Sequence, residues 1–130
     1  MAFRLLSIDD SKAVHFFIKD CLKTFDVVIT DEFDGKAGEE RIMKDTKAFD
    51  MILLDWEMPE QDGLTTLTNL RAANIAIPIV MLTSKNKPED IEKILNLGAS
   101  EYMMKPFTAD ILLQKIEDVV GAPLVSHADK

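Results

Sequence analysis

The chain has 130 residues, of which 47% are hydrophobic and 29% are charged, and this is the size and balance of one soluble globular domain. Its formal net charge of −8, without a basic run, argues against direct binding to nucleic acid. Because there is no long apolar run, no signal-peptide pattern and no second cysteine beside Cys21, we expect a cytoplasmic protein that makes no membrane contact.

The chain begins with a predicted strand over residues 3–8, and Ser11 then opens a helix over about residues 12–24. The apolar side chains that we expect to face the core from this helix are Val14, Phe17, Ile18, Cys21 and Phe25. The opposite face carries Lys12, Phe16, Lys19 and Lys23. We expect this opposite face to dock a partner through Phe16, although lone surface aromatics are also common.

A second strand is predicted over residues 26–30, followed by an Asp34-Gly35 turn and a weak, charged helix over about residues 38–45. The third strand, over residues 51–55, is apolar up to Asp55, which is typical of a strand buried on both faces. A loop and a helix over about residues 64–73 follow it.

The fourth strand is predicted over residues 78–83, and the next helix begins at Pro88 and stops at Gly98. A fifth strand over residues 101–104 precedes a last helix, which Thr108 caps and Gly121 ends. The side chains that we expect these two helices to bury are Ile91, Ile94, Leu95, Leu112, Leu113, Ile116, Val119 and Val120.

Five strands that alternate with five helices predict an α/β fold, with a parallel sheet covered by helices on both faces. We expect one domain over residues 1–121 and a frayed tail over residues 122–130. No output domain is expected after the last helix, so the chain is either a stand-alone protein or one domain of a longer protein.

Polar side chains stand where the predicted strands end: Asp9, Asp10, Asp55, Thr83 and Lys105. In a parallel sheet these strand ends share one edge, so we expect the side chains to converge. Clustered carboxylates repel one another, and a hard divalent cation such as Mg²⁺ relieves that repulsion. With a lysine and a hydroxyl beside it, such a site suits phosphoryl transfer to a carboxylate.

The sequence resembles the response-regulator receiver domains, the CheY-like family. The matching stretches are residues 5–11, 52–59 with Asp62-Gly63, 78–84 and 97–107. The resemblance covers roughly residues 3–121 and implies a doubly wound, flavodoxin-like sheet with the strand order 2-1-3-4-5. CheY is itself a standard example of that order, so the order is implied by the resemblance alone.

The resemblance also implies a role for each matching residue. Asp55 accepts a phosphoryl group from a phosphohistidine on a sensor histidine kinase or a histidine phosphotransfer protein. Asp10, Asp55 and the backbone carbonyl of Glu57 ligate Mg²⁺ (or Mn²⁺), while Asp9 acts largely through water. Lys105 pairs with the phosphoryl oxygens. Such a protein is a regulatory phospho-acceptor rather than an enzyme acting on other substrates.

The same resemblance implies how phosphorylation changes the conformation and which residues set the rate at which the phosphoryl group is lost. Thr83 moves toward the phosphoryl group, Tyr102 changes rotamer with it, and a downstream protein binds the face made by the fourth helix, fifth strand and fifth helix. Glu57 and Lys85, two residues after Asp55 and Thr83, tune the loss of the phosphoryl group. We expect these two opposite charges to pair across the opening and to slow hydrolysis.

Three alternatives on this fold are open. A flavodoxin-type FMN carrier needs a Ser/Thr/Gly-rich phosphate loop after the first strand, where this chain has Asp9-Asp10. A pseudo-receiver that only binds proteins normally lacks a site residue, and none is missing. An aspartyl phosphatase needs a substrate cap and a shorter acid than Glu57.

Overall fold

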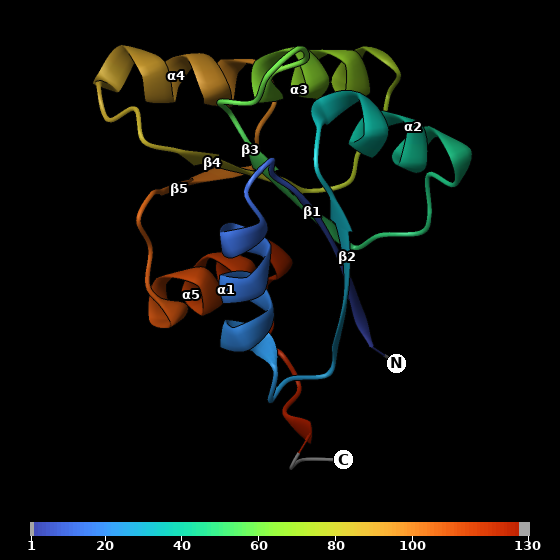
Figure 1. Ribbon diagram of the computed structural model, residues 1–130, viewed down its shortest axis with the longest axis vertical. Coiled ribbons are helices and arrows are strands. Elements are labelled where there is room, and N and C mark those ends of the chain that lie inside the picture. Colours follow the sequence, from blue (N-terminus) through green and yellow to red (C-terminus); the bar gives the residue numbers. More distant parts are fainter. Residues whose placement is uncertain (1, 128–130) are drawn as a thin grey trace.

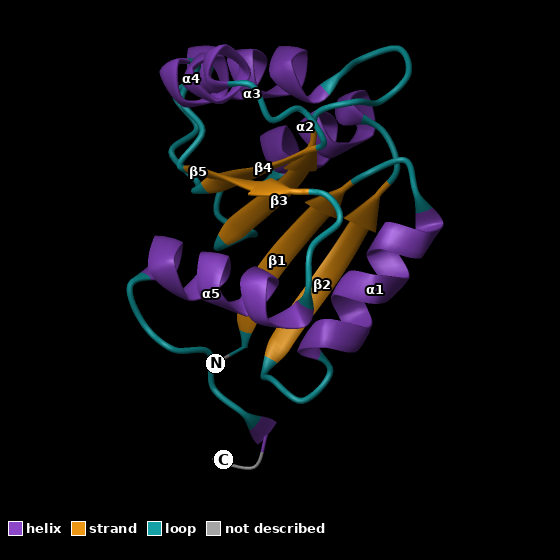
Figure 2. Cartoon of the chain, turned by 90° about the vertical axis from the view of Figure 1, so that its left-hand side faces the viewer, coloured by secondary structure: helices purple, strands orange, loops and turns teal. Residues whose placement is uncertain are grey.

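The structure is a computed structural model and describes residues 2–127. A five-stranded parallel sheet with the strand order β2-β1-β3-β4-β5 lies between two layers of helices (Figures 1 and 2). The strands are β1 (Phe3–Ile8), β2 (Val27–Glu32), β3 (Met51–Asp55), β4 (Ile79–Thr83) and β5 (Glu101–Met104). The helices are α1 (Lys12–Leu22), α2 (Gly35–Lys44), α3 (Gly63–Ala72), α4 (Pro88–Asn96) and α5 (Ala109–Val120). The expected fold class and strand order are therefore confirmed.

The core has two halves because β3 and β4 are buried on both faces of the sheet. One half packs under α2, α3 and α4 and includes Ile42, Leu67 and Ile94. The other half packs under α1 and α5 and includes Ile18 and Leu112. The absence of apolar–polar alternation in β3 and β4 follows from this double cover.

Four helices begin with a side-chain cap. Ser11, Asp34, Asp62 and Thr108 each accept a hydrogen bond from the backbone N–H three residues on, which satisfies a donor that the first turn leaves free. The helix expected over about residues 38–45 is therefore present but begins earlier, at Gly35, and the expectation of a separate turn at Asp34-Gly35 is wrong because Asp34 caps this helix. Gly121 ends α5 with a positive φ of 80°, as a left-handed C-cap requires.

Three apolar side chains are more exposed than their helical spacing indicates. Phe17, Leu95 and Val120 are each about 40% exposed, so the expectation that they are core residues is wrong. All three stand at the margin of an apolar face, where the spacing is compatible with burial but no second layer covers the side chain.

The segment after α5 is anchored as far as it is described. The backbone N–H of Asp26 donates to the carbonyl of Val125 at 2.7 Å, and Ser126 forms an antiparallel bridge with Phe25. Leu124 packs against the core half under α1 and α5. The expected fraying is therefore wrong for residues 122–127, and residues 128–130 lie outside the described part of the chain. No helix in residues 2–127 has the length and apolar character needed to cross a membrane.

Candidate functional site

Three carboxylates meet at the carboxyl edge of the sheet. Asp9 follows β1 and Asp55 ends β3, and the register pairs Ile8 with Leu54, so the two aspartates reach the same level on neighbouring strands. One carboxylate oxygen each from Asp9, Asp10 and Asp55 lie within 4.8 Å of one another. Asp9 and Asp55 are buried and Asp10 is exposed, so the cluster is in contact with solvent through Asp10.

Lys105, just after β5, is the ammonium that reaches this cluster. Its Nζ donates to Asp9 Oδ2 at 2.9 Å and to Asp55 Oδ1 at 3.0 Å. Burial by itself lowers the pKa of Lys105, but the hydrogen bonds to the two carboxylates outweigh burial and raise that pKa above its ordinary value. The lysine is therefore charged at neutral pH and joins the ends of β1, β3 and β5.

The carboxyl group of Asp55 has an unusually high proton affinity. Burial raises its pKa to about 6, the hydrogen bond from Lys105 opposes this rise, and the charges of Asp9 and Asp10 add to it. One lysine therefore does not balance three acids. A hard cation with oxygen ligands would relieve the remaining repulsion, and the three aspartates fit Mg²⁺ in donor type and spacing.

The backbone around Asp55 admits only a small neighbour. Gly63, the first residue of α3, donates its N–H to the Trp56 carbonyl at 2.8 Å. A Cβ at Gly63 would come within 2.2 Å of the Asp55 carbonyl oxygen. The glycine of the Asp62-Gly63 pair thus lets α3 begin directly against the aspartate's backbone.

Thr83 ends β4 at the same edge and is 1% exposed. Its Oγ1 accepts a hydrogen bond from the Lys85 N–H at 2.9 Å, and its carbonyl accepts one from the Lys105 N–H at 2.9 Å. Since a hydroxyl oxygen that accepts can still donate its own hydrogen, the Thr83 side chain retains a donor for a ligand at this edge.

The expected ion pair between Glu57 and Lys85 is absent from the described residues. Ser84 donates its hydroxyl to Glu57 Oε1 at 3.1 Å. The Lys85 ammonium lies instead 5.3 Å from the centroid of the Trp56 ring, a cation–π contact. Neighbouring residues, rather than each other, therefore hold Glu57 and Lys85.

Tyr102 lies in β5 below the edge and is half-buried against the core half under α2, α3 and α4. The ammonium of Lys115, on α5, lies 5.1 Å from the Tyr102 ring centroid and also pairs with Glu101 at 3.5 Å. The structure therefore places Tyr102 in β5 within reach of Lys115 but does not bring it into the acidic cluster.

The outer face of α1 carries the expected exposed aromatic. Phe16 is 74% exposed, and Lys12, Lys19 and Lys23 are exposed on the same helix or at its end. Two of these lysines have acidic partners: Lys19 pairs with Asp31 of β2, and Lys23 pairs with Asp20 at 3.1 Å. The surface is therefore less positive than its lysines alone indicate.

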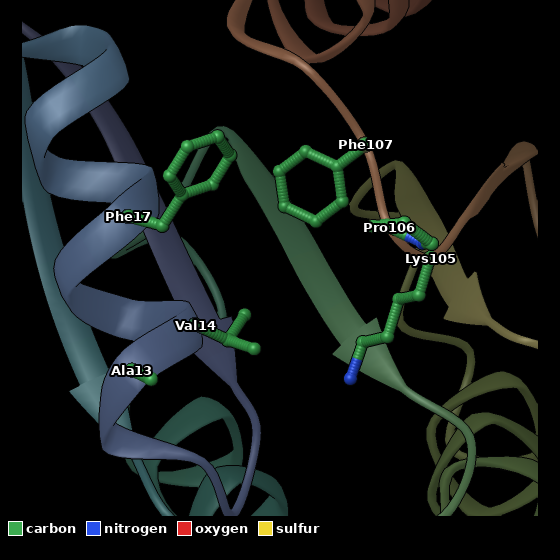
Figure 3. A pocket seen from close by; sticks show the side chains of 6 residues that line it. All are labelled: Ala13, Val14, Phe17, Lys105, Pro106 and Phe107. Atoms are coloured by element: carbon green, nitrogen blue, oxygen red, sulfur yellow. The ribbon is translucent and has the colours of Figure 1, made fainter.

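An apolar groove of about 480 Å³ lies beside Lys105, between α1 and the segment that follows β5. Figure 3 shows Val14 and Phe17 on one side and Pro106 and Phe107 on the other. The ring centroids of Phe17 and Phe107 are 5.4 Å apart. This contact explains why Phe17, although outside the core, is not fully exposed.

Sequence reasoning did not identify His15, which is buried on α1 against the acidic cluster. Its Nε2 lies 2.7 Å from the backbone carbonyl oxygen of Asp9. The signal was present in the spacing, because His15, Ile18 and Leu22 form the buried row of α1. The spacing alone gives His15 no role, because an ionisable side chain in this row only interrupts an otherwise apolar face.

A parallel sheet of this strand order, with a carboxylate cluster and a lysine at its carboxyl edge, defines the receiver class of α/β domains. The chain belongs to the response regulator receiver domain family, whose model matches residues 5–117. It is therefore a phospho-accepting regulatory domain of two-component signalling. This membership argues against an FMN carrier or a phosphatase on the same fold.

Relatives of two kinds are similar to this chain. The transcriptional regulatory protein DltR of Streptococcus agalactiae is 38% identical over 113 residues, which are 87% of this chain but 50% of DltR. The chain thus spans about half of that relative. The chemotaxis protein CheY1 of Helicobacter pylori is 34% identical over 123 residues, covering 91% of this chain and 97% of CheY1.

Solved structures agree with the fold. The chemotaxis response regulator CheY4 of Vibrio cholerae superposes with a TM-score of 0.84 at 26% identity, covering 92% of this chain and 99% of that chain. The receiver domain of the Francisella response regulator 1452 gives a TM-score of 0.83 at 30% identity, covering 91% and 96%.

Proposed function

We propose that Asp55 is the residue that accepts the phosphoryl group, from a phosphohistidine on a sensor histidine kinase or a histidine phosphotransfer protein. The carboxylate oxygen that Lys105 does not contact forms a bond to phosphorus as the bond from phosphorus to the donor nitrogen breaks. The electron pair of the broken bond returns to the donor imidazole. The single observation that supports this assignment is the burial of Asp55 between Lys105 and the carboxylates of Asp9 and Asp10.

The residues proposed to hold Mg²⁺, or Mn²⁺ in its place, are Asp10, Asp55 and the backbone carbonyl of Glu57, with Asp9 acting largely through water. When bound, the cation supplies positive charge to the phosphoryl oxygens and to the carboxylates. Lys105 adds a second positive charge, already oriented by Asp9 at 2.9 Å. Preorganised charge of this kind lowers the barrier without a later rearrangement.

The signal is proposed to leave the site through Thr83 and Tyr102. The free hydroxyl hydrogen of Thr83 can be donated to a phosphoryl oxygen, which draws the end of β4 toward Asp55. The space that this movement vacates allows Tyr102 to turn inward. The surface of α4, β5 and α5 then binds the downstream protein, and that partner, the absence of nucleic-acid binding and the cytoplasmic location remain predictions.

The assignment of Asp55 is tested by labelling with a small acyl phosphate and Mg²⁺. Wild type is expected to gain one acid-stable, base-labile phosphoryl group, and Asp55→Asn is expected to gain none. Asp50→Asn is the matched control, because it changes the aspartate that directly precedes the same strand. Undiminished labelling of Asp55→Asn would show that another residue accepts the group, and wild type that gains no label would leave a pseudo-receiver that only binds proteins as the better description of this chain.

The outer face of α1 is proposed to dock the phosphodonor through Phe16 with Lys12 and Lys19. Phe16→Ala is expected to slow transfer from the cognate phosphohistidine protein several-fold, while labelling by a small acyl phosphate is unchanged. Met43→Ala, which removes an exposed apolar side chain from α2, is the control and should slow neither reaction. Equal losses with both donors would show that Phe16 acts on the fold rather than on docking.

A further inference from the structure

His15 joins three elements at the acidic edge of the sheet. It stands on α1 and is 3% exposed. Its Nε2 lies 2.7 Å from the carbonyl oxygen of Asp9, and its Nδ1 lies 3.1 Å from Asp31 Oδ1 at the end of β2. The ring of Phe33 meets the imidazole nearly edge-on, with the ring centroids 4.7 Å apart. The imidazole is therefore fixed on several sides.

The geometry determines which nitrogen carries a proton. A carbonyl oxygen can only accept, so Nε2 must donate to Asp9. The contact between Nδ1 and Asp31 is at ion-pair distance but lacks the direction of a hydrogen bond. Asp31 itself is held from outside by Lys19. The Nε2–H bond is thus the directional contact of the ring, and Asp31 and Phe33 limit how the ring can turn.

Asp9 is held at every polar atom of its backbone and side chain. Its N–H donates to the Glu32 carbonyl at 3.1 Å, Oδ1 accepts from the Ser11 N–H at 2.9 Å, and Oδ2 accepts from Lys105 at 2.9 Å. The carbonyl oxygen is the remaining atom, and His15 is its partner. A buried carbonyl that lost this donor would have to shift to find another, and the carboxylate would move with it.

We infer that His15 is a positioning residue: it fixes the backbone of Asp9 so that the Asp9 carboxylate faces Asp10, Asp55 and Lys105 in the arrangement that receives the divalent cation. The inference rests on the proposed cation site and adds to it a residue outside the cluster. Groups that orient metal-site residues in this way alter metal affinity without touching the ion.

Two substitutions at His15 test the contacts of its two ring nitrogens separately. The amide nitrogen of His15→Gln reaches the place of Nε2 and can still donate to the Asp9 carbonyl. The amide of His15→Asn reaches only the place of Nδ1, beside Asp31. With Mn²⁺ as the probe and its free concentration followed by electron paramagnetic resonance, His15→Asn is expected to weaken binding at least about tenfold, and His15→Gln by no more than about twofold.

The control for packing is Ile18→Val, which removes one buried methyl group from the same row of α1 and is expected to bind Mn²⁺ like wild type. Phe33→Ala, on a partly exposed residue, frees the ring without touching its hydrogen bond and is expected to weaken binding a few-fold. This variant carries the test if His15→Asn does not fold.

Each outcome discriminates. Wild type that binds no Mn²⁺ overturns the cation site and this inference together. Wild-type binding with unchanged affinity in His15→Asn or, where that variant does not fold, in Phe33→Ala overturns the inference alone. Equal losses in His15→Asn and His15→Gln, or a loss in Ile18→Val that follows its lower stability, would also overturn it, because the Asp9 hydrogen bond would then not be the cause.

Discussion

The two ends of β3 carry the same chemical group in opposite environments. Asp50, just before the strand, accepts hydrogen bonds from the Arg4 guanidinium at 2.9 and 3.2 Å, and both side chains are exposed. Those hydrogen bonds lower the pKa of Asp50. Asp55, at the other end, also has a cationic partner, yet burial raises its pKa to about 6.

Burial, rather than the presence of a cationic partner, therefore decides whether the pKa of each of these two carboxyl groups is raised or lowered. At the amino end the Asp50 carboxylate is exposed to water as well as bound by Arg4. The Arg4–Asp50 pair joins the start of β3 to β1. At the carboxyl end Asp9 and Asp55 are buried while Asp10 is exposed, and a single lysine serves several acids. The carboxyl end therefore favours either a bound cation or the protonation of Asp55, because both reduce the uncompensated negative charge.

The largest expected effect is on the free energy of unfolding, and it comes from substituting Asp55. Because its folded-state pKa is raised from 3.8 to about 6, the folded state binds the proton more tightly, and stability is lost as pH rises through that window. Asp55→Asn should therefore raise the free energy of unfolding at pH 8, without divalent metal, by about 1–3 kcal/mol after allowance for partial solvation. The measurement is urea unfolding at pH 8 and at pH 4.

The gain from Asp55→Asn should vanish near pH 4, where the wild-type carboxyl is largely protonated in the folded state. If the proposed cation site is correct, excess Mg²⁺ should also narrow the difference in the free energy of unfolding at pH 8, because a ligand that binds only the folded state stabilises it. If Asp55→Asn were less stable than wild type at pH 8, the claim that the buried Asp55 carboxylate destabilises the fold would be wrong.

A smaller effect of opposite sign is expected from Asp50→Asn. The lowered pKa of Asp50 means that its contribution to stability is present above its unfolded pKa and is lost as pH falls through the lower folded pKa. The substitution should cost about 0–1 kcal/mol at pH 7, since exposed pairs contribute little. Urea unfolding with and without high salt provides the check, because salt should shrink the loss. A stabilising effect at pH 7 would remove the difference in sign between the two aspartates.

The weakest effect concerns the lifetime of the phosphoryl group, at the carboxyl end alone. Ser84 holds Glu57, so Ser84→Ala should free that side chain and change the decay of phosphorylated protein a few-fold, less than about 1 kcal/mol in the barrier. Lys85→Ala, which removes only the contact with Trp56, should change it less. Decay after donor removal in excess Mg²⁺ measures both. A larger effect from Lys85→Ala would instead support the expectation from the sequence that Lys85 slows hydrolysis of the phosphoryl group.

The strands and the residues at their ends could be predicted from the sequence. Buried runs such as residues 51–55 are apolar up to their last residue because a sheet covered on both faces admits little else. Since parallel strands end at one edge, the convergence of Asp9, Asp55 and Lys105 could be predicted from the sequence. Local caps such as Ser11 and Thr108 were equally predictable, because donor and acceptor lie within one turn.

The contacts of the remaining side chains depend on tertiary structure. Whether Phe17 is buried depends on Phe107, which is distant in sequence. The anchoring of residues 122–127 depends on Asp26, and the partner of Glu57 is Ser84 from another loop. In the sequence His15 is only a polar interruption of a helix, until the Asp9 carbonyl is seen beside it. Periodicity reports the direction in which a side chain points along its own element, whereas its burial and its partner depend on what another segment places there.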